Sequence, residues 1–157
     1  MDFEIEEIKL FSGRMAHIYT IRPNNSDTTL FEDFYNENID EFPDDLQEIK
    51  NVLYLAGHEK GCRSPYFKPN EGRLGDGVAA LKVGNLRVYC LLIGKITVIL
   101  GSGGYKSPEI KAYQEDEALN AKAQQVIRYA EQINRKIIEK DIRIVIDGKL
   151  TINNWDD

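Results

Sequence analysis

The alternation of hydrophobic and polar positions predicts two groups of strands, one within residues 3–22 and one within residues 67–100. Residues 15–22 alternate and are rich in β-forming side chains, and residues 3–11 are expected to pair with them across Ser12-Gly13-Arg14. From residue 66 onward the period is again two. The strands expected there cover 67–71, 78–83, 85–93 and 96–100, the last two forming a hairpin that turns at Gly94-Lys95, with the glycine-rich residues 101–104 ending the final strand.

Helical spacing appears in three other segments. Thr28 or Thr29 is predicted to cap a short helix that runs through Asn36. A second helix begins at Pro43 and ends at Gly57. A third is expected from Tyr113 to about Ile138, with an apolar face that docks on a sheet. The residues of that face are Leu119, Val126, Ala130, Ile133 and Ile137.

The last segment, residues 141–157, alternates cleanly and predicts a terminal β-hairpin. Ile142, Ile144 and Ile146 precede Asp147-Gly148, a sequence suited to a type I′ turn, and Leu150 and Ile152 follow it. A lone hairpin is marginal in water. We therefore expect it to pack on the domain or to pair with a strand edge, including that of a second copy, which would make a homodimer.

The order of these elements predicts an α+β protein. Strands grouped in one run, with helices before and after it, do not suit a doubly wound parallel sheet. We find no repeat, low-complexity stretch or long linker, so the expectation is one domain over residues 1–157, with 141–157 as an added hairpin.

Composition narrows the class of protein. No stretch is apolar enough to span a membrane, and the start of the chain lacks the features of a signal peptide, so we expect a cytoplasmic protein. The two cysteines, Cys62 and Cys90, lie in dissimilar surroundings and are expected to be reduced. With two histidines besides, the chain offers too few good ligands for a structural zinc site, and we expect no metal or cofactor.

Charge is distributed unevenly along the acidic chain, whose net charge is −6. Residues 1–50 hold 13 acidic and 4 basic side chains, whereas residues 51–114 hold 4 acidic and 9 basic ones. The basic block coincides with the predicted central strands. It is consistent with a surface that holds a phosphate backbone, and equally with solvated strand edges guarded by lysine.

Residues 85–90 (Asn-Leu-Arg-Val-Tyr-Cys), followed by 94–101 (Gly-Lys-Ile-Thr-Val-Ile-Leu-Gly), resemble the RelE/HigB superfamily of toxin–antitoxin toxins, above all its phage-derived HigB-like branch. The order of elements from residue 18 to about 138 is similar too. The resemblance implies a curled antiparallel sheet with two N-terminal helices and one long C-terminal helix. It also implies a ribosome-dependent endoribonuclease that cleaves mRNA by 2′-hydroxyl attack without a metal, held inactive by a small antitoxin.

The resemblance assigns roles to individual residues. Arg87 and Lys106 would stabilise charge in the transition state, and Tyr113 would stack on a base or transfer a proton. Contacts to RNA would come from Lys68, Arg73 and Tyr105. We expect Arg87, Lys106 and at least one of Lys68 and Arg73 to share one concave face. Each also has a simpler interpretation: Arg87 as a cross-strand ion pair, Lys106 as a loop lysine and Tyr113 as a packing residue.

The chain departs from the family in ways that keep other functions open. Both histidines, His17 and His58, lie outside the predicted meander, and the loop after its last strand carries one basic residue, Lys106. The alternatives are a non-catalytic binding protein of the same fold and a ParE-like toxin that inhibits gyrase. A nucleotide-triphosphatase is excluded, because Tyr105 precedes Lys106 and Pro108 prevents a helix from following the loop directly.

Overall fold

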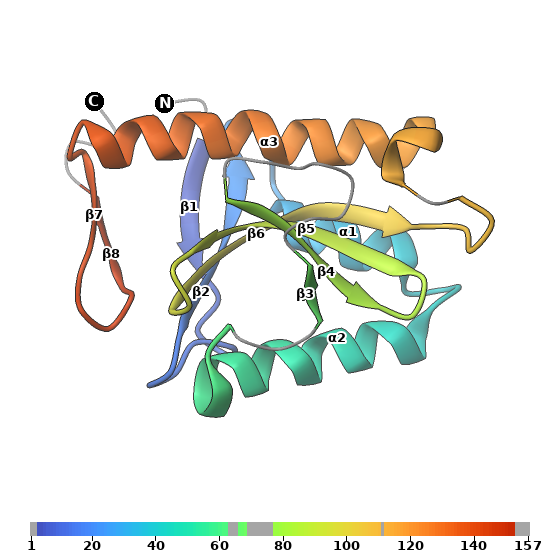
Figure 1. The fold of residues 1–157 in the computed structure, drawn as a ribbon, viewed down its shortest axis with the longest axis horizontal. Coiled ribbons are helices and arrows are strands. Elements are labelled where there is room, and N and C mark those ends of the chain that lie inside the picture. The colour runs from blue at the N-terminus through green and yellow to red at the C-terminus, as the bar shows by residue number, and fades with distance from the viewer. Residues whose placement is uncertain (1–2, 63–65, 69–76, 111, 153–157) are drawn as a thin grey trace.

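A computed structural model of the protein describes residues 3–62, 66–68, 77–110 and 112–152. It is an α+β structure in which a six-stranded sheet lies between helices on both faces (Figure 1). The strands are β1 (Phe3–Glu7), β2 (His17–Pro23), β3 (Phe67–Lys68), β4 (Val78–Val83), β5 (Leu86–Ile93), β6 (Thr97–Tyr105), β7 (Ile142–Ile144) and β8 (Leu150–Ile152). The α-helices are α1 (Leu30–Asn38), α2 (Pro43–Leu55) and α3 (Glu117–Ile138).

The strand order in the sheet is β1-β2-β6-β5-β4-β3. Strands β3 to β6 form the expected antiparallel meander, and β1 pairs with β2 as an antiparallel hairpin. The expectation of a wholly antiparallel sheet is wrong at one place, because β2 runs parallel to β6. Between them lie α1, α2 and three strands, and so long a crossover allows neighbouring strands to run in the same direction.

Strand β6 continues beyond the point where the glycines were expected to end it. It runs through residues 101–104 to Tyr105, with an irregularity in its ladder to β5 between Val88 and Cys90. At Gly103 a Cβ atom would collide with the carbonyl oxygen of Arg87. Glycine at this position therefore keeps the two backbones close, and it does not interrupt the strand.

Helices α1 and α2 begin where the sequence predicts. Thr29 caps α1, with its hydroxyl accepting from the Glu32 N–H while the Glu32 carboxylate accepts from the Thr29 N–H. Pro43 opens α2. The helix does not end at Gly57, however. It passes into a single π-turn (Ala56–Lys60) that stops at Gly61, whose φ is +68°.

The two faces of the sheet pack against different helices. Even-numbered side chains of β5, such as Val88 and Cys90, face α1 and α2, whereas the odd-numbered Tyr89 and Leu91 face α3. The expected apolar face of α3 is confirmed, with Ile137 half-buried and the other four residues buried: Leu119, Val126, Ala130 and Ile133. The helix itself begins at Glu117, after a 3₁₀ turn at Tyr113–Glu115.

The terminal hairpin forms a separate two-stranded sheet (β7-β8) that packs on the α3 side. Ile142 and Leu150 are buried there, and the Tyr19 hydroxyl accepts a hydrogen bond from the Leu150 N–H at 2.9 Å. The expected packing on the domain is thus confirmed. The prediction of a type I′ turn at Asp147-Gly148 is wrong. Such a turn needs positive φ at both central residues, and here Gly148 has positive φ, at +93°, but Asp147 does not.

Candidate functional site

The register of the meander brings basic side chains to the face of the sheet that α3 packs on. Lys82 pairs with Arg87, and Lys68 pairs with Ala80, which lies on that same face. Arg87 in turn pairs with Gly104, where a Cβ would contact Leu119 of α3. We call Lys68, Lys82, Arg87 and Lys106 the basic face.

Lys106 is the first residue after β6 and extends its ladder with β5. Its N–H donates to the carbonyl oxygen of Asn85 at 2.7 Å. Alternation along the strand therefore places Lys106 on the same side of the sheet as Arg87, two residues beyond Gly104. Its side chain is half-exposed, whereas those of Lys68 and Lys82 are exposed.

The guanidinium of Arg87 is held within the protein. The residue is only 4% exposed, and its Nη1 donates to the carbonyl oxygens of Gly84 at 3.1 Å and Leu86 at 3.0 Å. These bonds hold it beneath the β4–β5 turn, directly opposite Lys82. Lys82 and Arg87 thus bring two positive charges to facing positions of one ladder.

The two tyrosines assigned from the resemblance lie in different surroundings from the basic face. Tyr113 is 2% exposed, and its ring meets that of Tyr89 edge to face at a centroid distance of 5.7 Å. Burial raises the pKa of the Tyr113 hydroxyl. Tyr105 is 41% exposed, but it points to the opposite side of the sheet, where its ring stacks on Phe42 at 5.2 Å.

Sequence reasoning assigned Arg73 to this site and missed Lys82. Arg73 lies outside the residues that the structure describes. Lys82 could have been found, because residues 78–83 were expected to be a strand and the turn at Gly84-Asn85 sets their register with residues 85–93. Placing the residue across from Arg87 needed only that hairpin register.

The histidines have partners elsewhere in the fold. The His17 ring lies between two carboxylates, with Nδ1 at 2.6 Å from Glu7 and Nε2 at 3.5 Å from Asp147. The Lys149 N–H and the nearby His17 lower the pKa of the Asp147 carboxyl. His58 stacks on Tyr54 at 4.2 Å. Neither ring belongs to the strands that form the basic face, so that face has no histidine to act as acid or base.

Metal and thiol chemistry are not indicated by the described part of the chain. It contains no group of three His, Cys, Asp or Glu side chains that could hold a metal ion. Both cysteines are buried and unpaired with each other, and burial raises the pKa of Cys62 to about 12 and that of Cys90 further still. Such thiols are poor nucleophiles at neutral pH.

Within residues 3–62, 66–68, 77–110 and 112–152, no helix is both long and apolar enough to cross a membrane. Comparison with protein-family models, with curated proteins and with solved structures finds no match to this chain.

Proposed function

We propose that the chain binds RNA along the basic face, where its resemblance to RelE/HigB-type toxins also implies contacts to RNA. The observation that supports this best is the strand register that sets Lys82 opposite Arg87 and brings Lys68 to the same side of the sheet. Phosphates supply most of the affinity in RNA binding, and they require cations clustered on one surface. The cluster concentrates positive charge locally on a protein that is acidic as a whole.

We propose that the protein binds RNA on this face without cleaving it. Cleavage by 2′-hydroxyl attack needs groups that reach the phosphate and the hydroxyl proton. The Arg87 guanidinium donates to backbone carbonyls, and the Tyr113 ring is buried against Tyr89. Arg87 would act through its charge beneath the surface, while Lys68 and Lys82 make the direct contacts.

Ribosome-dependent mRNA cleavage is the second candidate. The ladder contact between Lys106 and Asn85 favours it, because it sets Lys106 on the same side of the sheet as Arg87, as the ribonuclease assignment requires. An active toxin of this kind would be paired with a small antitoxin protein. The ribosome would then position the mRNA and compensate for the single basic residue in the loop after β6.

RNA binding can be tested with purified protein and a short fluorescein-labelled single-stranded RNA. We expect K68E/K82E to weaken binding roughly tenfold and to reduce the salt dependence by about 0.7 for each phosphate that the variant no longer neutralises. The matched control is K60E/K95E, which makes the same total charge change at two exposed lysines away from the basic face, one at the end of the π-turn and one in the turn at the other end of β5. Equal weakening in K68E/K82E and K60E/K95E would show that only net charge matters, and no binding by the wild type would refute the proposal.

Induction of the chain alone in a bacterial host separates binding from toxicity. Growth arrest with loss of mRNA, abolished by K106A, would establish cleavage in place of simple binding. Arrest with a DNA-damage response would indicate a gyrase inhibitor. Normal growth together with RNA binding in vitro is the result expected for a non-catalytic RNA-binding protein.

A further inference from the structure

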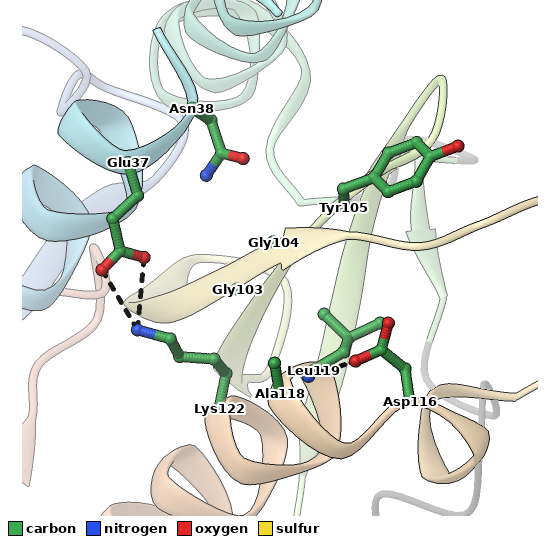
Figure 2. A pocket seen from close by; sticks show the side chains of 9 residues that line it. All are labelled: Glu37, Asn38, Gly103, Gly104, Tyr105, Asp116, Ala118, Leu119 and Lys122. Carbon is green, nitrogen blue, oxygen red and sulfur yellow. Dashed lines mark hydrogen bonds and ion pairs between the residues drawn. The ribbon is translucent and has the colours of Figure 1, made fainter. Parts of the chain in front are cut away.

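A second surface of the protein has the opposite chemistry to the basic face. A pocket of about 260 Å³ opens where the outer edge of β6 passes between the end of α1 and the start of α3 (Figure 2). Nine residues line it: Glu37, Asn38, Gly103, Gly104, Tyr105, Asp116, Ala118, Leu119 and Lys122. Its charged groups are two carboxylates and one ammonium, so it does not suit a phosphate.

The floor of the pocket is a strand edge. Strand β2 pairs with β6 only from Thr97 to Leu100, and no other described strand pairs with β6 on that side. The bond from the Lys106 N–H to Asn85 shows that Leu86 and Tyr105 are a non-hydrogen-bonded pair of the β5–β6 ladder. The N–H and C=O of Tyr105 therefore point away from β5, toward the pocket side.

The side chains at the pocket supply acceptors in excess. Asn38 is 7% exposed, and its Nδ2 donates to the Phe34 carbonyl oxygen at 2.8 Å. Its Oδ1 accepts no hydrogen bond from any described residue and lies at the pocket wall (Figure 2). This oxygen is open to the pocket, so it can accept a hydrogen bond from a donor group of a ligand.

Asp116 and Glu37 add negative charge on either side of the strand. Asp116 caps α3 with Oδ1, which accepts from the Leu119 N–H at 3.0 Å, and this leaves its second oxygen for another donor. Glu37 contacts the Lys122 ammonium at 3.2 Å, and the two side chains reach toward each other at one end of the pocket (Figure 2). At the other end lies Tyr105, which is stacked on Phe42 and remains 41% exposed.

From this arrangement we infer that the pocket receives an arginine of an extended segment of a partner protein, added as a strand along β6. An arginine guanidinium has five N–H donors and no acceptor, and it stacks on aromatic rings. It would meet Asp116, the Asn38 oxygen and the exposed face of Tyr105. The backbone of the same segment would pair with the edge at Tyr105, as in other cases of strand addition. This inference is independent of RNA binding on the basic face.

The test is an NMR titration of the full chain with a blocked peptide, acetyl-Thr-Val-Arg-Val-Thr-amide. We expect the largest shifts at the backbone amides of 103–105 and at the Asn38 side-chain amide. Replacing the arginine by citrulline, which is neutral and of the same shape, should weaken binding about tenfold.

Variants of the protein locate the effect. D116N removes the charge but keeps the helix cap, because asparagine caps as well as aspartate. It should weaken binding of the arginine peptide about tenfold and leave the affinity of the citrulline peptide unchanged. E48Q, at an exposed position on α2, serves as the matched control and should have no effect.

Equal binding of the two peptides, shifts confined to the β7-β8 hairpin, or no binding would each overturn the inference. So would a single-stranded RNA that shifts residues 103–105 while the peptide does not. RNA binding through the basic face could fail or succeed independently, because it is tested by the RNA affinity of K68E/K82E and not by the peptide affinity of D116N.

Discussion

The hydroxyl of Tyr19 on β2 accepts a hydrogen bond from the Leu150 N–H on β8, at 2.9 Å and across 131 positions of the chain. Both groups are buried, and burial raises the pKa of Tyr19. A second bond of this kind runs from the Thr97 hydroxyl to the Gly148 carbonyl oxygen at 2.6 Å. Together they attach the terminal hairpin to the sheet through hydrogen bonds in addition to hydrophobic contact.

Replacing Tyr19 by phenylalanine should detach this end of the hairpin. The substitution leaves the Leu150 N–H buried without an acceptor, which costs about 1–3 kcal/mol. Hydrogen exchange at the Leu150 amide should accelerate, while exchange in β4 and β5 should not. Unchanged protection at Leu150 would contradict the role of this hydrogen bond.

Deleting residues 141–157 should lower the melting temperature. It removes the side chains of Ile142 and Leu150, 1% and 8% exposed, each worth about 1.5–3 kcal/mol of burial. Sedimentation on the same sample tests the expected homodimer. If the hairpin joins two copies, the full chain sediments as a dimer and the truncated chain as a monomer. A truncated chain with unchanged melting temperature and oligomeric mass would show that the hairpin is a free appendage.

Truncating Ile133 to alanine should cost about 2–5 kcal/mol of unfolding free energy, because the residue is 0% exposed between α3 and the sheet. Ile138, five residues further along the same helix, is 81% exposed and provides the control. I138A should change stability by less than about 0.5 kcal/mol. Chemical denaturation measures both, and similar losses at the two positions would mean that the packed face of α3 has been misplaced.

Two adjacent glycines of β6 should differ in how they tolerate substitution by alanine. At Gly103 a Cβ collides with the Arg87 carbonyl oxygen, so G103A should destabilise by at least about 1–3 kcal/mol. At Gly104 the nearest atom is Cδ1 of Leu119 at 3.7 Å, an ordinary contact, so G104A should be tolerated. Thermal unfolding of the two variants decides the matter, and a stable G103A would show that β6 and β5 are not held so closely.

Stability should depend on pH through Asp147. The Lys149 N–H, and then the nearby His17, lower the pKa of this carboxyl below its ordinary value of 3.8. A group with a lowered folded pKa stabilises the protein above its ordinary pKa, and this contribution is lost as the pH falls through the lowered value. The difference in unfolding free energy between wild type and D147N should therefore shrink as the pH falls through the acid range in which Asp147 becomes protonated. A difference that grows on acidification would contradict the sign.

The sequence by itself determined the elements whose signals are local. The capping box of Thr29 and Glu32, the proline at the start of α2 and the spacing of apolar residues in α3 each act within a few turns of one helix. The pattern of residues 78–83 and 85–93 was likewise sufficient to predict β4 and β5. The position of Lys82 opposite Arg87 could have been derived from the turn between these two strands, but it was missed.

The tertiary structure alone decided the features that depend on distant parts of the chain. The parallel pairing of β2 with β6 requires a crossover of two helices, and no local pattern records its direction. Residues 101–104 continue β6 because β5 and the helices pack around them, although glycine weakens a strand taken alone. The burial of Tyr113 against Tyr89 arises only when the turn before α3 packs on the sheet, and the pocket between Asn38 and Asp116 only when α1 and α3 approach the same strand edge. Contacts between such remote segments are set by packing and not by local propensity.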